Sequence, residues 1–226
     1  MLSSKRILIT AGPTKEFIDP VRFISNASSG KMGYAIAEEL NNKGADVILV
    51  SGPTNLKCNS SQIKIIQVTT ALEMLQACQH YFDSVDIAIF TAAVADYRPI
   101  KMESSKIKKS DETMLIQLTK NPDIAYEFGK RKRADQLSIG FALETDNIVE
   151  YGKGKMQKKN LDFIVLNTTN ENGEGFGFDT NKISLLFRDN SIEHFPLKSK
   201  KEVASDIIAS LEKQLQQLFT KQLHCI

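Results

Sequence analysis

Short apolar runs alternate with helical repeats along the first part of the chain. Four of the runs have the length and composition of buried strands, namely residues 6–11, 45–50, 63–68 and 86–91. Two intervening stretches place apolar residues at helical spacing, namely residues 31–43 and 71–82. Gly44 stands at the expected C-cap of the first helix, and Thr70 at the expected N-cap of the second. Strands that are apolar throughout and alternate with helices predict a parallel sheet covered on both faces.

The pattern is less regular after residue 96. Strands are expected at residues 114–118, 137–143 and 161–167, and helices at residues 121–133, 146–159 and 199–218. Asn121 and Pro122 are expected to open the first of these helices, because a proline in the first turn loses no hydrogen bond. Residues 170–177 are polar and rich in glycine, which predicts a loop.

A β-hairpin is predicted near the end of the chain, where Asp189 and Asn190 separate two strand-like stretches. The flanking stretches are residues 183–188 and 192–195. The expected fold class is therefore α/β: a Rossmann-like parallel sheet flanked by helices, with a less regular C-terminal half that carries the hairpin. The 226 residues suit a single domain over residues 1–226, with a regular half at 1–96 and a second half at 97–226.

Composition and charge argue against several functional classes. The formal net charge of +2 is too small to predict bulk nucleic-acid binding, and no stretch approaches the roughly 20 apolar residues of a membrane-spanning helix. The apolar run at the N-terminus is too short for the core of a signal peptide. Cys58, Cys78 and Cys225 are too few and too widely spaced for a disulfide framework or a zinc site, which fits a reducing, cytoplasmic compartment.

A polar loop that runs directly into the first predicted helix is the first candidate for chemistry. Residues 19–33, DPVRFISNASSGKMG, bring small residues to a helix N-terminus, where free N–H groups and the helix dipole favour a phosphate. Ser25 and Met32 stand where a Walker A loop needs glycine and a hydroxyl residue, and the dinucleotide fingerprint is absent after the first strand. A long loop before a well-capped helix is the alternative interpretation.

A second candidate lies at the end of the fourth predicted strand, in residues 91–99, TAAVADYRP. Ligands of open α/β sheets bind at the carboxyl ends of strands. Ala92, Ala93 and Ala95 leave the backbone open to contact, and Asp96 is the acid of this segment. A packing turn with a solvated aspartate is the competing interpretation.

Two groups of lysines are further candidates. Lys106, Lys108 and Lys109 put three cations into four residues, which could cover a triphosphate, although such runs are more often solvated. Lys155 and Lys159 are four residues apart and share one face of a predicted helix, where an anion could offset their mutual repulsion. An ordinary exposed helix face explains the second group equally well.

Taken together, these segments resemble phosphopantothenoylcysteine synthetase, the synthetase half of the bifunctional coenzyme A biosynthesis protein. The resembling stretches are ITAGPTKEFIDPVRFISNASSGKMGYAIAEEL, LVSGPT, TALEM, AAVADYRP, KIKK, LTKNPDI, IGFALET and KKNLDFIVLN. They occur in the family's order between Ile7 and Asn167, and the first of them is long and highly specific. The residues after about Thr168 resemble the family only weakly.

The resemblance implies an acid–amine ligase that joins 4′-phosphopantothenate to L-cysteine. It implies an acyl-cytidylate intermediate formed from CTP, release of pyrophosphate and CMP, a requirement for Mg²⁺, and no flavin. It also implies a homodimer, with the second half of the chain carrying a flexible lysine loop and the dimer contacts. The close match to bacterial motifs favours CTP over ATP, although the sequence itself does not distinguish the two bases.

The resemblance also assigns roles by motif position. It makes Asn26 the catalytic residue that holds the acyl-nucleotide, and Lys106 the catalytic residue that assists activation. The implied nucleotide contacts are Ala92, Asp96, Lys106, Pro122, Asp123, Ile124, Ala125, Phe141, Lys155 and Lys159. The implied phosphopantothenate contacts are Arg22, Asn26, Ser28, Ser29, Gly30, Lys31 and Ala93. No metal ligands are assigned.

Two other functional hypotheses use the same architecture. An NAD(P)-dependent oxidoreductase is compatible with a Rossmann-like sheet, but the missing glycine fingerprint argues against it. A non-catalytic nucleotide-binding module would bind CTP without turnover, and the presence of Asn26 and Lys106 argues against that reading.

Overall fold

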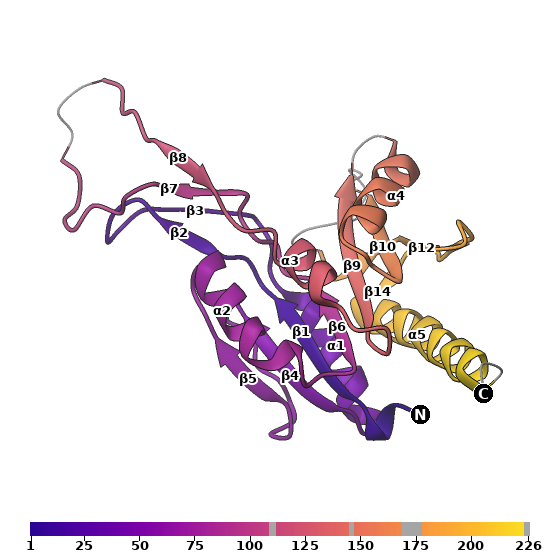
Figure 1. The fold of residues 1–226 in the computed structure, drawn as a ribbon. Helices are drawn as coiled ribbons and strands as arrows, with labels where there is room; N and C mark the ends of the chain where they lie inside the picture. The colour runs from indigo at the N-terminus through magenta and orange to yellow at the C-terminus, as the bar shows by residue number, and fades with distance from the viewer. Residues whose placement is uncertain (109–111, 145–146, 169–177, 224–226) are drawn as a thin grey trace.

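An eight-stranded sheet forms the centre of the protein (Figure 1). The computed structural model describes residues 1–108, 112–144, 147–168 and 178–223. The strands lie in the order β13 (Ile192–His194), β12 (Ile183–Phe187), β10 (Phe163–Thr168), β9 (Leu137–Glu144), β6 (Ile87–Phe90), β1 (Arg6–Ala11), β4 (Asp46–Ser51) and β5 (Lys64–Gln67). The six strands from β10 to β5 are parallel, and β12 and β13 add an antiparallel hairpin. The predicted α/β class is confirmed.

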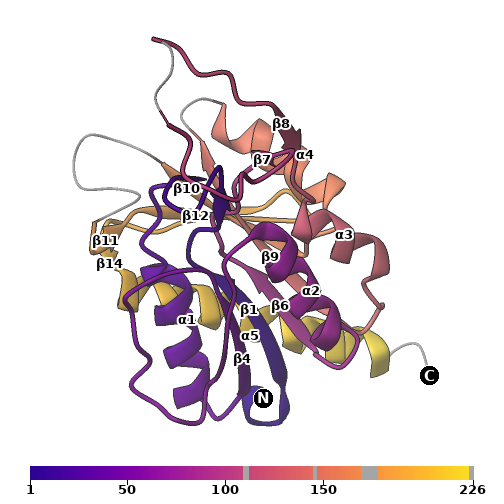
Figure 2. The same cartoon turned by 90° about the vertical axis from the view of Figure 1, so that its left-hand side faces the viewer.

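Helices cover both faces of this sheet. The flanking helices are α1 (Lys31–Asn42) and α5 (Lys200–Leu223) on one face, and α2 (Ala71–Phe82), α3 (Ile124–Arg131) and α4 (Ile148–Lys158) on the other. Side chains of β1 alternate between the two cores: Ile7 and Ile9 pack with α1 and α5, whereas Leu8 packs with α2. Figure 2 shows α1 and α2 on opposite sides of β1 and β4. Burial on both faces explains why these strands are apolar throughout.

The predicted N-cap of the second helix is confirmed, and the glycine predicted as the C-cap of the first helix lies one residue beyond the actual C-cap, Lys43. Thr70 caps α2 through a reciprocal box, in which Glu73 N donates to Thr70 Oγ1 at 3.2 Å and Thr70 N donates to Glu73 Oε2 at 3.4 Å. Gly44 follows α1 with a φ of +81°, a left-handed conformation that favours glycine. The predicted turn at Asp189 and Asn190 does join β12 and β13.

Several boundaries in the second half differ from the predicted ones. The helix expected from residue 121 begins at Ile124, because Asp123 is its N-cap and accepts a hydrogen bond from Tyr126 N at 3.1 Å. Pro122 therefore lies before the cap. The strand expected at residues 114–118 is wrong, since the strand here is β8 (Leu118–Lys120) and Leu115 is 92% exposed.

The remaining differences concern helix ends and the glycine-rich segment. The helix predicted at 146–159 is α4, which begins at Ile148, while Asp146 lies outside the described residues. The closing helix α5 continues beyond the predicted end, to Leu223. The loop predicted at residues 170–177 also lies outside the described residues.

Two short hairpins outside the central sheet were not predicted from the sequence pattern. β2 (Lys15–Phe17) pairs with β3 (Phe23–Ser25), and β7 (Tyr97–Pro99) pairs with β8. These two hairpins and the loops that they carry, residues 15–25, 97–108 and 112–120, project together from the sheet and are called the arm below (Figure 1). Two small elements complete the fold: the antiparallel pair β11 (Thr180–Asn181) and β14 (Lys198–Ser199), and the short helix η1 (Leu2–Ser4).

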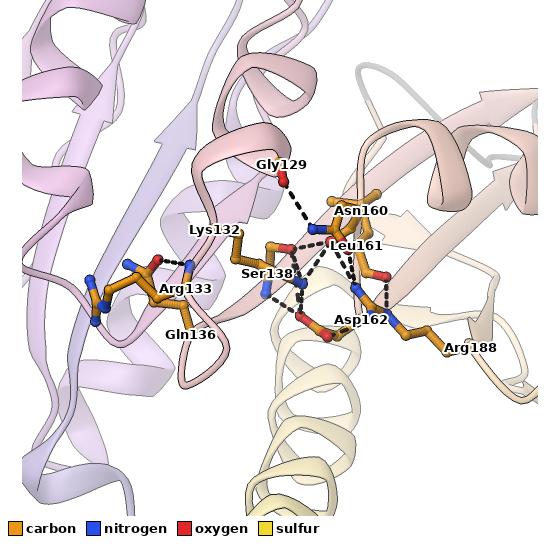
Figure 3. A network of polar contacts seen from close by, with 9 residues as sticks. All are labelled: Gly129, Lys132, Arg133, Gln136, Ser138, Asn160, Leu161, Asp162 and Arg188. Carbon is orange, nitrogen blue, oxygen red and sulfur yellow. Dashed lines mark hydrogen bonds and ion pairs between the residues drawn. The ribbon is translucent and has the colours of Figure 1, made fainter.

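A buried ion pair joins the C-terminal strands at the end of the sheet where β9 and β10 begin (Figure 3). The Lys132 ammonium lies 2.8 Å from Asp162 Oδ2 and donates to the Asn160 carbonyl at 2.7 Å and to Ser138 Oγ at 3.2 Å. The same carboxylate oxygen accepts from Ser138 N at 2.7 Å. Burial lowers the pKa of Lys132, and Asp162 partly offsets this effect. Arg188 extends the network to the end of β12 by donating to Leu161 O at 2.8 Å.

Removing the carboxylate of this pair should destabilise the fold. In Asp162→Asn the buried Lys132 ammonium loses its counter-charge, so we expect the free energy of unfolding to fall by about 3 kcal/mol. Urea denaturation at pH 7 measures this change. Asp135→Asn is the control, because the Asp135 side chain is 60% exposed where it pairs with Arg133, and its effect should stay below about 1 kcal/mol. Equal losses in the two variants would contradict a special role for the buried pair.

Candidate functional site

A cavity of about 420 Å³ opens at the carboxyl ends of β1, β6, β9 and β10. The predicted site residues that line it are Asn26, Ser28, Ser29, Gly30, Lys31, Ala92, Ala93, Asp96, Pro122, Asp123, Ile124, Ala125, Phe141, Lys155 and Lys159. The fold therefore brings together segments that are more than 100 residues apart in sequence, at the edge where open α/β sheets bind ligands. The individual roles assigned to these residues stay predictions.

The first turn of α1 forms one wall of the cavity, and glycines allow it to lie there. Gly30 precedes the helix with a φ of +80°, which a residue with a side chain rarely adopts. A Cβ atom at Gly33 would lie 2.5 Å from both Ala11 Cβ and Thr91 Oγ1. Only glycine permits this approach of helix to strands. No side chain caps α1, so the N–H groups of its first turn are available to an anion in the cavity.

Asn26 lies at the exposed rim of the same cavity, and the backbone fixes its side chain. Its Nδ2 donates to the carbonyl oxygens of Ala93 and Val94, each at 3.1 Å. Both acceptors belong to the segment that follows β6, so the amide is held against the strand end that carries Ala92 and Asp96. Because the amide nitrogen is held by these carbonyls, the amide oxygen is the end of the side chain that can accept a hydrogen bond from a ligand.

The first turn of α3 forms another wall. Asp123 caps this helix and also pairs with Lys159 from α4, whose Nζ lies 3.1 Å from Asp123 Oδ1. Asn121 fixes the preceding loop, since its Nδ2 donates to Ala95 O at 2.8 Å and its backbone N donates to Asp96 O at 2.8 Å. A second helix N-terminus and a lysine are therefore held at the cavity.

Arg22 and Lys106 are not among the residues that line the cavity, because both lie on the arm. Buried Asp19 accepts from Arg22 Nε at 2.9 Å and from Ile107 N at 3.2 Å, and Arg22 Nη2 donates to Ile107 O at 3.1 Å. Arg22 and the backbone donors of this turn hold the pKa of Asp19 well below its usual range. The lysine loop is thus tied to the turn between β2 and β3, while the Lys106 side chain itself is exposed.

The structure adds cavity residues that the sequence did not indicate. They include Thr10, Asn121, Asn167, Asn181 and Lys200. The last two come from the part of the chain where the family motifs end, so no motif could point to them. Lys200 is only 8% exposed, and the Oδ1 atoms of Asn167 and Asn181 are buried without a hydrogen-bond partner among the described residues.

The carboxylates at the cavity are the residues that could hold a metal ion. Across the described residues, no three His, Cys, Asp or Glu side chains gather as a metal-binding group. Asp96 and Asp123 are the carboxylates among the described lining residues, and Mg²⁺ is commonly held by one or two carboxylates together with substrate phosphates. Cys58 and Cys78 are free thiols, and Cys225 lies outside the described residues. None of the helices in the described part of the chain is long and apolar enough to cross a membrane.

Fold and cavity together define a Rossmann-like α/β protein with a cavity at the carboxyl edge of its sheet. Residues 2–215 match the model of a family described as "DNA/pantothenate metabolism flavoprotein C-terminal domain", and the chain belongs to this family. The match confirms the resemblance that the sequence motifs indicated.

Two known proteins are similar to this chain over most of its length. It is 45% identical over 216 residues to the coenzyme A biosynthesis bifunctional protein CoaBC of Bacillus subtilis strain 168, a match that covers 94% of this chain and 53% of that protein. It is 48% identical over 210 residues to a protein named cysteine/cysteine sulfinic acid decarboxylase from an unknown prokaryotic organism, covering 93% of this chain and 58% of that protein. The chain thus spans about half the length of the curated relatives it matches.

A solved structure shares the fold closely. The crystal structure of the C-terminal domain of CoaBC superposes with a TM-score of 0.81 at 42% identity, and the match covers 96% of this chain and 100% of that one. This agreement confirms the fold class.

Proposed function

We propose that the protein is an acid–amine ligase of coenzyme A biosynthesis that condenses 4′-phosphopantothenate with L-cysteine at the expense of CTP. One observation carries the proposal: a single cavity is lined by the N-terminal turns of α1 and α3 and by the rim amide of Asn26. The uncapped N-terminus of α1 suits one phosphate group, and Lys155 and Lys159 at the wall near α3 add positive charge for a second phosphorylated substrate. The family and the CoaBC relatives support the same pathway.

The proposed reaction has two steps. An oxygen of the substrate carboxylate attacks the α-phosphorus of CTP, the bond to the β-phosphate breaks, and pyrophosphate leaves. The cysteine amine then attacks the acyl carbon, the bond to CMP breaks, and the nitrogen loses a proton as the amide forms. Mg²⁺ bound with the triphosphate would neutralise charge, and Asp96 and Asp123 are the lining carboxylates that fit it. No flavin takes part in this scheme.

The side chains at the cavity suit these steps. The oxygen of Asn26 accepts from the cysteine amine, because its Nδ2 is already held by backbone carbonyls. Lys155 and Lys159 add positive charge on the wall formed by α4, where the nucleotide is proposed to bind. Lys106 is proposed to reach the cavity of a partner subunit from the arm, since it does not line the cavity of its own chain.

A pyrophosphate-release assay tests the proposed reaction. With 4′-phosphopantothenate present, we expect faster release with CTP than with ATP, and formation of the amide only when cysteine is added. The same preparation should bind no reduced nicotinamide cofactor in a fluorescence titration. Binding of that cofactor, or pyrophosphate release that does not depend on 4′-phosphopantothenate, would overturn the assignment.

Substitutions of Asn26 and Lys106 should separate the two steps. Asn26→Asp should release pyrophosphate but accumulate the acyl-cytidylate, because a carboxylate cannot donate to the Ala93 and Val94 carbonyls that hold the Asn26 side chain in place. Lys106→Gln should slow pyrophosphate release by about 100-fold or more, since it removes a cation from the triphosphate. Lys101→Gln is the matched control on the same loop, where the side chain is 77% exposed, and its turnover should equal that of the wild type. Unchanged turnover in Lys106→Gln would refute the role of the loop.

A homodimer is also proposed, with the arm in the contact. Large apolar side chains are exposed along the arm: Val21, Phe23, Tyr97, Ile100, Met102, Met114, Leu115 and Leu118. Such a concentration of exposed apolar surface marks a protein interface. The arm includes the loop of Lys106, so a partner docked on it would receive that lysine near its own site.

Light scattering after gel filtration tests the dimer. The wild type should have about twice the 25.2 kDa mass of one chain, and Ile100→Asp should shift it toward the monomer because a buried charge destabilises an apolar contact. Leu197→Asp is the control, since this side chain is 47% exposed and belongs to none of the segments that form the arm. A monomeric wild type, or the same shift in both variants, would count against the arm as the interface.

A further inference from the structure

Next to the first turn of α1, the cavity ends in a group of polar side chains drawn from both halves of the chain. Lys31 comes from α1, Asn181 from β11, and Lys200 from the start of α5, and all three line the cavity. Asp179 lies beside them and forms an ion pair with Lys31. These four residues are called the lysine corner below.

Lys200 is the unusual member of the lysine corner, because it is a cation that is 8% exposed. Its Nζ donates to Phe178 O at 2.6 Å, and its backbone N donates to Asp179 O at 2.9 Å. Burial lowers the pKa of Lys200, and repulsion from Lys31 lowers it further, while Asp179 acts in the opposite direction. Among the described residues, the ammonium groups of Lys31 and Lys200 lie near the Asp179 carboxylate at the N-terminus of α1, so positive charge exceeds negative charge there.

The carboxylate of Asp179 is poorly placed to neutralise this corner permanently. Its side chain is 83% exposed, so water screens its attraction to Lys31 and holds the pair only weakly. Lys31 is the main reason why the pKa of Asp179 is lowered. An anion with more charge could therefore replace this carboxylate at little cost.

Asn181 gives an independent sign that the corner receives a ligand. The residue is 4% exposed, its Nδ2 makes only a long contact of 3.8 Å with the Met32 sulfur, and its Oδ1 is buried without a partner among the described residues. A buried polar atom that lacks a hydrogen bond costs free energy. Rotation of the amide by half a turn would place an N–H donor at this position, where an anion could accept from it.

We propose that the lysine corner binds a phosphate group, with Lys200 as a further binding residue and Asp179 as an internal carboxylate that the phosphate displaces. The proposal rests on the proposed function, because that function supplies the phosphorylated substrates. A phosphate dianion matches two ammonium groups and a free helix N-terminus better than a carboxylate does. The group belongs either to phosphopantothenate or to the triphosphate of CTP, and binding measurements distinguish these sources.

Isothermal titration with the full chain, without cysteine, tests the corner. The ligands are 4′-phosphopantothenate and CTP, each compared with its unphosphorylated counterpart, pantothenate or cytidine. Lys200→Gln should lower the affinity for one phosphorylated ligand by about 10- to 100-fold and leave the affinities for the unphosphorylated ligands unchanged. The ligand that loses affinity identifies the source of the phosphate. Lys201→Gln is the matched control, because Lys201 is the adjacent, exposed lysine of α5 and should bind as the wild type does.

Two further variants distinguish a loss of phosphate binding from a failure of the protein to fold. Lys200→Arg keeps the charge and should retain most of the affinity, while Asp179→Asn should tighten binding of the same ligand by roughly threefold or more, since it removes the competing carboxylate. Full affinity in a folded Lys200→Gln, or no tightening in Asp179→Asn, would overturn the proposal. If the wild type binds the phosphorylated ligands as described but releases no pyrophosphate, the proposed ligase activity is refuted, whereas phosphate binding at the lysine corner is still supported.

Discussion

The close approach of the first turn of α1 to strands β1 and β6 is the constraint on which the cavity depends. Gly33 leaves no room for a side chain against Ala11 and Thr91, and Gly30 enters the helix through a left-handed conformation. Because no side chain caps the helix, its free N–H groups face the cavity. A bulkier residue at either glycine would push the helix away from the strand ends and remove the wall that suits an anion.

The rest of the cavity comes from the second half of the chain, which is anchored elsewhere. Phe141, Lys155 and Lys159 reach the cavity from β9 and α4. At the opposite end of β9 and β10, the ion pair of Lys132 and Asp162 joins the starts of the same two strands, because Asp162 also accepts a hydrogen bond from Ser138 N. A satisfied, buried polar network fixes the strands where no ligand is needed, so the cavity end can keep unpaired polar groups. The buried ion pair and the cavity thus lie at opposite ends of the sheet.

The sequence was sufficient to predict the elements that are regularly buried, and it was insufficient to predict those whose structure depends on a single contact. The parallel strands were predictable, because side chains such as Leu8 and Ile9 are buried on both faces. The hairpin of β2 and β3 was not, because its strands have three residues each and Glu16 is buried to accept a hydrogen bond from Ala71 N. In the site, the polar loop of residues 19–33 gave a local signal. Lys200 gave none, since only the tertiary fold brings it beside Lys31.

The arm limits how Arg22 and Lys106 can act. Arg22 already makes a charge-assisted pair with Asp19, the strongest kind of side-chain hydrogen bond, so only the part of its guanidinium that is turned away from Asp19 can serve a phosphate. The same aspartate also accepts from Ile107 N, next to Lys106 in the chain. Arg22 and the lysine loop are therefore linked by hydrogen bonds through Asp19 and Ile107. A cavity that receives Lys106 from this arm must also receive Arg22 close by, so the two cations would act on one substrate complex rather than separately.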